Sequence, residues 1–267
     1  MGEILAGEAE LERAFPIRTQ QEGHIARIRF NEPERYNPLR LAVIKALHRA
    51  LDAIAEDHQV RAVILEAEGK AFCAGHDLRE IRATEKREHH QSLFDRCSAL
   101  MQRILSLPQP VIARVQGIAT AAGCQLVATA DLAVAGRSAR FATSGIKLGL
   151  FCSTPAVAIS QVMPRKKALE MLLTGDFMDS EEAVRVGLVN RVVDDETLSA
   201  VTTELAEQIA SHPPAAIRAG KALFHRLEGK SLQEAYDDAS ATMACNMDTD
   251  AAREGVDAFL EKRRPRW

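Results

Sequence analysis

The sequence predicts an α/β fold with a helical C-terminal region, on three observations. Short apolar strands alternate with helices up to about residue 195, as they do in α/β proteins. Every segment after that point has the pattern of a helix. The chain has 267 residues, 46% of them hydrophobic, and is therefore long enough to bury a large core. We expect an α/β core over residues 1–195 and a helical region over residues 196–267.

The elements of the core follow from the spacing of its apolar residues. Alternation of apolar residues with arginines over 23–30 predicts a strand, paired in a hairpin with 15–20. Apolar residues three and four positions apart from Leu41 to Ile54 predict an amphipathic helix. Asp77 and Glu80 form a capping-box pattern, with Asp in the Ser/Thr place, at the start of another helix. The other expected elements are strands at 61–66, 110–116 and 132–135, and helices at 90–105 and 121–130.

The C-terminal region reads as four helices, at 196–211, 214–226, 232–245 and 249–264. The pair Pro213-Pro214 separates the first two, because proline interrupts a helix. A helical tail after an α/β core often packs on a neighbouring subunit. Two long uncharged runs, 115–130 and 148–164, are shorter than the ~20 apolar residues of a membrane-spanning helix. We expect both to be buried core.

Charge and cysteine content exclude several classes of protein. The net charge is -3, from 34 Lys+Arg against 37 Asp+Glu, which excludes a nucleic-acid binder that relies on overall positive charge. It also provides no attraction to an anionic membrane surface. The five cysteines are an odd number without a C-x-x-C pair, which favours free thiols in a reducing compartment. The acidic first 15 residues resemble neither a secretory signal nor a transit peptide. We therefore expect a cytoplasmic protein.

Common catalytic and metal-binding signatures are absent from the sequence. It has no G-x-G-x-x-G, no Walker loop, no H-E-x-x-H and no G-x-S-x-G. His89 and His90 occupy adjacent positions of a predicted helix, so their rings point apart. We expect no metal site.

Two loops of small residues could carry chemistry. KAFCAGHDL (70–78) and GIATAAGCQL (117–126) each lead from a predicted strand into a helix. The start of a helix has unpaired N–H groups and the positive end of the dipole, so two such turns brought together would form an oxyanion hole. The alternative is tight strand-to-helix packing, which also favours Gly and Ala. Spacing alone leaves both interpretations open.

These loops resemble the signature of the crotonase superfamily, the enoyl-CoA hydratase/isomerase family. The resemblance extends through RYNPL, QGIATAAGCQLVATADL, FATSGIKLGLFCSTP, MPRKKALEMLLTGD, EEAVRVGLVNRVV and DAFLEKRR. GHDL and ATAAGCQLVA resemble its branch of enoyl-CoA hydratase domain-containing proteins. The resemblance implies a spiral of ββα units and a helical C-terminal trimerisation region. It further implies homotrimers or hexamers, a CoA thioester substrate, and no cofactor other than the CoA of that substrate.

The resemblance also implies the site residues. The donors of the oxyanion hole would be the backbone N–H groups of His76 and Ala122, the latter where the family usually has Gly. The side chain of His76 is expected to face away, and Asp77 is also explained as a helix N-cap. Lys262 would contact CoA from a neighbouring subunit, although a basic helix end is also favoured by the dipole alone. The substrate-binding positions are Arg35, Ala74, Asp77, Leu78, Thr143, Phe151, Cys152, Phe259 and Lys262.

Two departures from the family pattern affect the chemistry. The two catalytic glutamates of a hydratase of this family correspond to Gln125 and Gly145. Gln cannot exchange a proton near neutral pH, and Gly has no side chain. General acid–base catalysis is worth about 10² to 10⁴ in rate, so we expect an enoyl-CoA hydratase in name whose hydration is weak.

Other functions remain open at this point. Decarboxylation of a malonyl-type thioester needs an enolate stabiliser but no base, and the family's methylmalonyl-CoA decarboxylase branch shares the GHD turn. The tyrosine of that branch corresponds to Cys152 here. Thioester hydrolysis would use Ser144, Ser153 or Cys152, none of which has an evident base. A non-catalytic acyl-CoA-binding protein is the remaining alternative.

Overall fold

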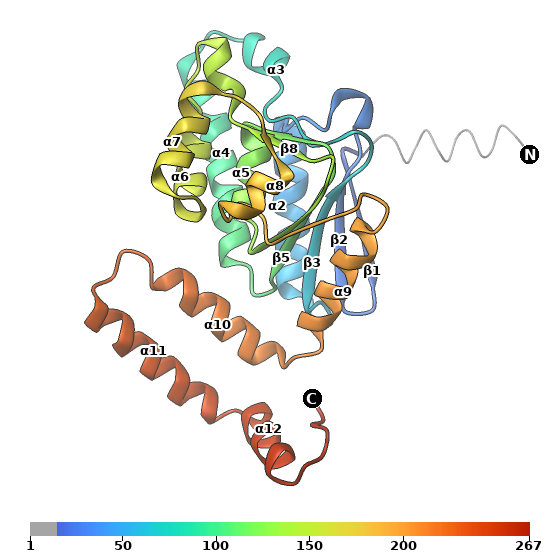
Figure 1. Ribbon diagram of the computed structural model, residues 1–267, viewed down its shortest axis with the longest axis vertical. Helices are drawn as coiled ribbons and strands as arrows, with labels where there is room; N and C mark the ends of the chain where they lie inside the picture. The colour runs from blue at the N-terminus through green and yellow to red at the C-terminus, as the bar shows by residue number, and fades with distance from the viewer. Residues whose placement is uncertain (1–14) are drawn as a thin grey trace, which may run out of the picture.

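The computed structural model describes residues 15–267, in which two β-sheets are flanked by helices and a helical arm leaves the core (Figure 1). The sequence predicts that the first 15 residues are not a targeting segment. Apart from Phe15, those residues lie outside the described range. The strands are β1 (Ile17–Glu22), β2 (Ile25–Phe30), β3 (Ala62–Ala67), β4 (Ala71–Cys73), β5 (Val111–Val115), β6 (Ile118–Thr120), β7 (Leu132–Gly136), β8 (Arg140–Ala142), β9 (Met178–Asp179) and β10 (Arg191–Val193). The α-helices are α2 (Leu41–Glu56), α3 (Leu78–Arg82), α4 (Arg87–Ser106), α5 (Ala122–Thr129), α6 (Ser153–Val162), α7 (Arg165–Thr174), α8 (Ser180–Arg185), α9 (Leu198–Ala210), α10 (Pro214–Arg226), α11 (Leu232–Met247) and α12 (Asp250–Leu260). Two 3₁₀ turns are η1 (Pro33–Arg35) and η2 (Ser144–Leu148).

The strands form two sheets through a repeated ββα pattern. The larger sheet has the order β1-β2-β3-β5-β7-β10, and the smaller has the order β4-β6-β8-β9. Each of the pairs β3/β4, β5/β6 and β7/β8 gives its first strand to the large sheet and its second to the small one, before the chain continues into helix or 3₁₀ turn. Within the repeat the neighbouring strands are parallel. The carboxyl ends of β4, β6 and β8 therefore meet at one edge of the small sheet.

Helices cover both faces of the large sheet (Figure 1). α2, α4 and α5 bury their apolar stripes in the main core, which includes Leu47, Leu100 and Leu126. α9 covers the opposite face, where Leu198 and Leu205 pack on Ile64 of β3. Apolar burial of this kind contributes about 25 cal/mol for each Å² removed from water, and it fixes the sheet that positions the loops described below.

Most of the expected elements are confirmed. The hairpin, the helix from Leu41, the strands near 61–66, 110–116 and 132–135 and the C-terminal helices all form. The helix expected at 90–105 begins three residues earlier, at Arg87. The sequence did not show β4 or β6, which lie inside the two small-residue loops. At three residues each, they are too short for an alternating pattern to appear.

The expected capping box at α3 forms only in part. The carboxylate of Asp77 accepts a hydrogen bond from the Arg79 N–H (2.9 Å), so Asp77 is the N-cap. Glu80 does not return the bond, because its carboxylate accepts the N–H of Leu41 instead (2.9 Å). Glu80 therefore satisfies an orphan donor at the start of α2 and links the two helices.

The two uncharged runs differ in burial. The run 115–130 is largely buried as expected. The expectation is wrong for part of 148–164, because Leu148, Leu150 and Phe151 are 60%, 53% and 45% exposed. These residues lie at the end of η2 and directly after it, and they line a cavity described below. Among residues 15–267, no helix is long and apolar enough to cross a membrane.

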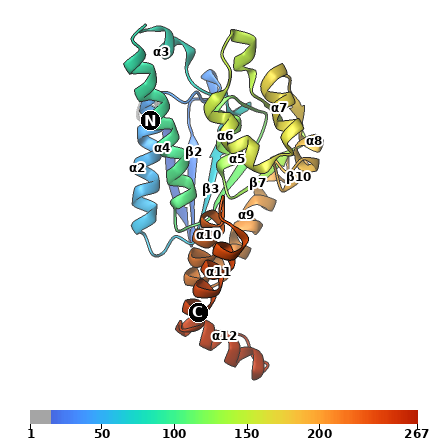
Figure 2. The ribbon, with the colours of Figure 1, turned by 90° about the vertical axis from the view of Figure 1, so that its left-hand side faces the viewer.

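The helical arm begins after α9. α9 packs on the large sheet, whereas α10, α11 and α12 extend away from the core below it (Figure 2). The change of packing thus comes at Pro213-Pro214, inside the helical region expected over residues 196–267, and the boundary at 195–196 stays a prediction. The long apolar side chains of the arm are exposed, among them Phe224 (75%) and Phe259 (82%).

One buried ion pair fixes the direction in which α10 leaves. The ammonium of Lys221, whose side chain is 7% exposed, donates to Asp131 Oδ2 (2.6 Å) and to the carbonyls of Ile104 and Gln109. Asp131 also accepts the Val111 N–H and lies 3.2 Å from His225 Nε2. Burial lowers the pKa of Lys221, although Asp131 opposes the shift.

We expect Lys221→Ala to lower the free energy of unfolding by about 3 kcal/mol, because a carboxylate and two carbonyls lose their buried partner. Lys45→Ala is the control, since Lys45 is exposed on α2. Urea unfolding followed by circular dichroism measures both variants. Equal stability of the two variants would show that α10 is held by something other than this pair.

Candidate active site

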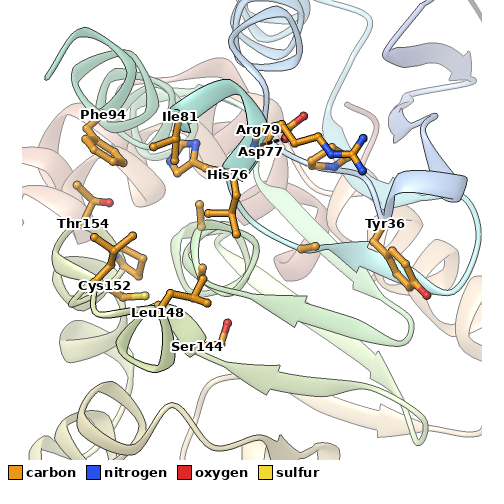
Figure 3. A pocket seen from close by; sticks show the side chains of 18 of the residues that line it. Tyr36, His76, Asp77, Arg79, Ile81, Phe94, Ser144, Leu148, Cys152 and Thr154 are labelled. Carbon is orange, nitrogen blue, oxygen red and sulfur yellow. Dashed lines mark hydrogen bonds between the residues drawn. The ribbon is translucent and has the colours of Figure 1, made fainter. Parts of the chain in front are cut away.

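The principal cavity has a volume of about 860 Å³ and opens at the carboxyl ends of β4, β6 and β8 (Figure 3). Three segments that follow these strands supply most of its wall: 74–81 after β4, Ala121 and Ala122 after β6, and 144–155 after β8. Residues 34–38 and Phe94 complete it. Parallel strands thus bring three loops together that lie far apart in the sequence.

The two small-residue loops touch through their backbones. Gly75 has a φ of +88°, and a Cβ placed there would lie 2.9 Å from Ala121 Cβ and 3.3 Å from Ala122 N. Gly123 in the second loop approaches Cys73 so closely that a Cβ would lie 2.0 Å from the Cys73 carbonyl oxygen. Only glycine fits at either position, so both glycines are required for the loops to meet.

Ala121 has a backbone conformation that is rare for a residue with a side chain. Its φ is 51° and its ψ is -119°, a combination that costs roughly 1–3 kcal/mol outside glycine. The Ala121 N–H donates to the Ala142 carbonyl (2.9 Å), which anchors the turn to β8. The ψ angle of Ala121 sets the orientation of the following peptide, and therefore the direction of the Ala122 N–H.

Two backbone N–H groups at this junction have no acceptor. Within residues 15–267, neither the His76 nor the Ala122 N–H donates a hydrogen bond. Ala122 is the first residue of α5, where an N–H has no intrahelical partner and the dipole is positive. Both residues line the cavity. The arrangement supplies two donors for an oxygen that carries negative charge.

The imidazole of His76 is held in the cavity wall. Its Nδ1 lies 3.1 Å from the Leu39 carbonyl oxygen, and the ring packs edge to face on Phe94 (5.4 Å between centroids). Burial lowers the pKa of His76, so the ring is neutral and Nδ1–H donates to Leu39. Nε2 is buried and has no partner among residues 15–267. The contacts with Leu39 and Phe94 thus hold the ring, and with it the loop, in place.

A charged rim lies on one side of the cavity. The guanidinium of Arg35 donates to Asp77 Oδ2, and Asp77 also caps α3. Tyr36 and Asn37 both have positive φ angles, of 61° and 52°. The Asn37 amide maintains this turn by donating to the carbonyls of Glu68 (2.9 Å) and Ala71 (2.8 Å). The Ala74 N–H donates to the Tyr36 carbonyl, so the rim is tied to the first loop.

An apolar wall lies on the other side, and sequence reasoning missed most of it. Ile81, Phe94, Leu148 and Leu150 line the cavity together with the expected Leu78 and Phe151 (Figure 3). Ile81 and Phe94 lie on helices, where an apolar residue ordinarily indicates core. Leu148 and Leu150 belong to the uncharged run that was expected to be buried. Neither pattern distinguishes a core residue from a residue of an apolar pocket.

Two expected site residues of the core, Gln125 and Thr143, do not line the cavity. Gln125 is 4% exposed on α5, and its Oε1 has no hydrogen-bond partner among residues 15–267. Thr143 is fully buried and donates through Oγ1 to the Met171 carbonyl (2.8 Å). Thr143 therefore ties η2 to α7. Of the other expected residues, Arg35, Ala74, His76, Asp77, Leu78, Ala122, Gly145, Phe151 and Cys152 line the cavity.

Gly145 lines the cavity, but its position has no room for a side chain. A Cβ there would lie 2.7 Å from the Leu150 carbonyl oxygen and 2.8 Å from Cys152 Sγ. The space of a side chain is thus already filled by residues 150–152. A carboxylate at this position would require that segment to move.

Phe259 and Lys262 lie at the far end of the arm. Phe259 is 82% exposed near the end of α12, and Lys262 follows that helix. α12 lies below the core, whereas α3, whose residues line the cavity, lies at the top of the core (Figures 1 and 2). The arm of one chain therefore does not bring these residues to the cavity of the same chain.

No nucleophile in the cavity has an activating partner. Burial raises the pKa of the Cys152 thiol, and a hydrogen bond from Gly145 only partly offsets the shift. Ser153 Oγ donates to the Phe151 carbonyl and Ser144 Oγ shares a hydrogen bond with Thr120 Oγ1 (2.8 Å). Within the described part of the chain, no three His, Cys, Asp or Glu side chains are arranged to hold a metal ion.

Comparisons with known proteins agree with this geometry. The model of the family "Enoyl-CoA hydratase/isomerase" matches residues 20–267. The chain is 43% identical to rat (Rattus norvegicus) mitochondrial enoyl-CoA hydratase domain-containing protein 3 over 249 residues, which are 93% of this chain and 83% of the relative. A crystal structure of enoyl-CoA hydratase from Mycobacterium smegmatis has a TM-score of 0.93 at 52% identity and covers 94% of this chain and 98% of that one. The human enoyl Coenzyme A hydratase domain-containing protein 3 has a TM-score of 0.92 at 42% identity, covering 94% and 100%.

We expect Ala121→Gly to raise the free energy of unfolding by about 1 kcal/mol, since glycine relieves the strain at a modest cost in chain entropy. Ala119→Gly, in the neighbouring strand β6, is the matched control and should lower it by about 1 kcal/mol. Thermal and urea unfolding measure both. A loss of stability in Ala121→Gly as large as in the control would mean that the turn is unstrained.

Proposed function

We propose, since the chain belongs to the enoyl-CoA hydratase/isomerase family, that it binds a CoA thioester in the principal cavity. The thioester carbonyl oxygen accepts hydrogen bonds from the N–H groups of His76 and Ala122. These donors stabilise the negative charge that the oxygen gains when the α-carbon becomes an enolate. The crotonase fold of the chain supports this assignment.

The observation that carries the proposal is the pair of unpaired N–H groups beside the cavity. Backbone N–H groups in folded proteins ordinarily have an acceptor, and here two without one occur where the loops meet. A thioester oxygen supplies the missing acceptor. Preorganised donors of this kind are worth about 10² to 10³ each in rate.

The cavity offers separate surroundings for the two ends of such a substrate. The apolar wall of Ile81, Phe94 and Leu148 suits an acyl chain. The rim with Arg35 and Ala74 suits the CoA moiety, whose phosphates are anionic. The substrate supplies its own CoA, so the proposal includes no further cofactor.

A homotrimer, or a hexamer of two trimers, completes the proposal. The arm exposes Phe224, Tyr236 and Phe259, and exposed apolar side chains on a projecting element are typical of an interface. In such an assembly Phe259 and Lys262 of a neighbouring subunit contact the CoA. The cytoplasmic location expected from the sequence stays a prediction, because several relatives carry the word mitochondrial in their names.

Hydration is weak in this proposal because neither family carboxylate is present. Gln125 is buried outside the cavity wall and Gly145 is closed to a side chain. Neither position therefore supplies a carboxylate to activate water or to protonate the α-carbon, and the Asp77 carboxylate in the wall is bonded to Arg35 and to the Arg79 N–H. The name enoyl-CoA hydratase then describes the family of the chain rather than its main reaction.

Decarboxylation of a malonyl-type thioester is the second candidate, favoured by this same lack of a base. The bond between the α-carbon and the carboxylate breaks, CO₂ leaves, and the electron pair forms the enolate held by the two N–H groups. A proton from water then completes the α-carbon. Thioester hydrolysis is less favoured, because burial keeps the Cys152 thiol protonated.

We expect Ala122→Pro to lower turnover, or acyl-CoA affinity where no turnover is found, by about 10²-fold, because it removes one donor. Ala122 is the first helical residue of α5, a position where proline is well tolerated. His76→Ala keeps its N–H and should lose less than tenfold. Activity and calorimetric binding are measured alongside circular dichroism, which must show that both variants are folded.

A larger loss of turnover or affinity in His76→Ala than in Ala122→Pro would assign a role to the imidazole, which packs against Leu39 and Phe94. Equal and small effects of both variants would mean that the N–H groups do not bind substrate, and the proposed oxyanion hole would be wrong.

We expect crotonyl-CoA hydration by the chain to be far below the rates typical of the family, by about 10²-fold or more. The double variant Gln125→Glu with Gly145→Glu should remain slow, because the new carboxylate at 145 meets residues 150–152. Enoyl-, malonyl- and acyl-CoAs are screened for turnover by mass spectrometry. Rapid hydration by the unchanged protein would contradict the proposal, and binding without any turnover would identify a non-catalytic acyl-CoA binder.

A further inference from the structure

A second cavity, of about 290 Å³, lies away from the candidate active site, where the arm leaves the core. Its wall comes from three segments: the turn before β3, the turn before β5, and the hinge between α9 and α10. These segments lie at the amino ends of β3 and β5, at the lower end of the sheet in Figure 1, whereas α3 and the principal cavity lie at the upper end.

The lining of this cavity is cationic without a counter-ion. His58, Arg61, His212 and Arg218 all line it, and no Asp or Glu does. Within residues 15–267, none of the four forms an ion pair with a carboxylate. The neighbouring carboxylate of Asp57 accepts the Gln59 N–H (2.8 Å). The guanidinium groups of Arg61 and Arg218 have no acid between them and repel one another, so a bound anion would remove an unfavourable interaction.

Two buried polar atoms of residues that line the cavity lack partners. Arg61 donates through Nη1 to the Ala210 carbonyl (3.1 Å), but its Nε is buried without an acceptor. Gln109 is 6% exposed, and its Nε2 donates to the carbonyls of Ile54 (2.9 Å) and Val60 (3.3 Å). Those bonds fix the amide, so the unpartnered Oε1 of Gln109 is an acceptor. These lining residues thus hold one unused donor and one unused acceptor.

The start of α10 faces the same cavity. Pro214, Ala215 and Arg218 of its first turns line the wall, and no side chain caps the helix. Prolines at 213 and 214 contribute no N–H, but the N–H of Ala215 has no acceptor among the described residues. The positive end of a 13-residue helix adds to the attraction of an anion.

We propose that this cavity binds a phosphate-type oxyanion, with hydrogen phosphate as the fitting species. Arg61 and Arg218 supply the positive charge, with His58 and His212 beside them in the lining, and the oxyanion supplies the acceptor that Arg61 Nε lacks. The O–H of hydrogen phosphate donates to Gln109 Oε1, which sulfate cannot do. The volume is at the lower limit for small-molecule sites, so the cavity fits a phosphate group with few further atoms and excludes a whole CoA.

Bound phosphate also joins the core to the arm. Arg61 and Gln109 belong to the core turns, whereas His212 and Arg218 belong to the hinge and α10. An anion between them links both sides by charge, next to the Lys221–Asp131 pair that anchors the same helix. Occupancy therefore stabilises the folded chain by mass action.

The test uses the full chain, with inorganic phosphate as the probe at constant ionic strength. Calorimetry gives the affinity and differential scanning fluorimetry gives the shift in melting temperature. Arg218→Ala and His212→Ala change exposed residues and should fold. Arg49→Ala, exposed on α2 and outside the cavity, is the matched control. We expect a loss of tenfold or more in affinity for Arg218→Ala, a smaller loss for His212→Ala and no change for Arg49→Ala.

Competing anions test the chemistry of the site. Sulfate should bind at least tenfold more weakly than phosphate, because it has no proton for Gln109. Glycerol 2-phosphate distinguishes a free phosphate from a small phosphate ester, and tighter binding of the ester would assign the site to such a metabolite. Equal affinity for phosphate and sulfate, equal loss in Arg218→Ala and Arg49→Ala, or no binding at 10 mM phosphate, roughly the upper limit for a specific small-anion site, would each overturn the proposal. None of these outcomes bears on acyl-CoA binding in the principal cavity.

Discussion

The close approach of two backbone segments is the constraint on which the candidate active site depends. Gly75 has no room for a Cβ beside Ala121 and Ala122, and Gly123 has none beside Cys73. Small residues thus bring the ends of β4 and β6 together more closely than any packed side chains would allow. The strained Ala121 then sets the direction of the N–H of Ala122, a residue that lines the cavity. The proposed donors are backbone atoms, so the sequence must place residues with small side chains, or none, around them.

Much of this could be predicted because helices and strands of ordinary length carry periodic signals. The helix at Leu41–Glu56 and the strand at Ala62–Ala67 were evident from apolar spacing. β4 and β6 were not, since three residues do not establish a period. The apolar wall was hidden for another reason: Leu148 and Leu150 have the composition of core but lie at a surface cavity. A linear pattern reports that a residue is apolar, and only the fold determines whether protein or ligand covers it.

Gly145 shows how a substitution can change the shape of a site as well as its chemistry. From the sequence, glycine there meant only the loss of a carboxylate. In the structure, the Leu150 carbonyl and Cys152 Sγ occupy the volume in which a side chain would begin. The Cys152 thiol in that place is buried and protonated. The segment after η2 therefore occupies the space of a side chain at position 145, so placing a carboxylate there would require repacking of residues 150–152.

The residues that the arm contributes to the proposed CoA site depend on how α10 is anchored to the core. Phe259 and Lys262 lie beyond reach of the cavity in their own chain (Figures 1 and 2). In the proposed trimer they contact the CoA of a neighbouring subunit, and where they arrive depends on the direction in which α10 leaves the core. That direction is set by the buried Lys221–Asp131 pair, close to the cationic cavity at the hinge. In that trimer, a small rotation at the hinge would be multiplied along three helices. Polar groups at the amino ends of the sheet would then control the CoA end of a site that lies at the opposite end.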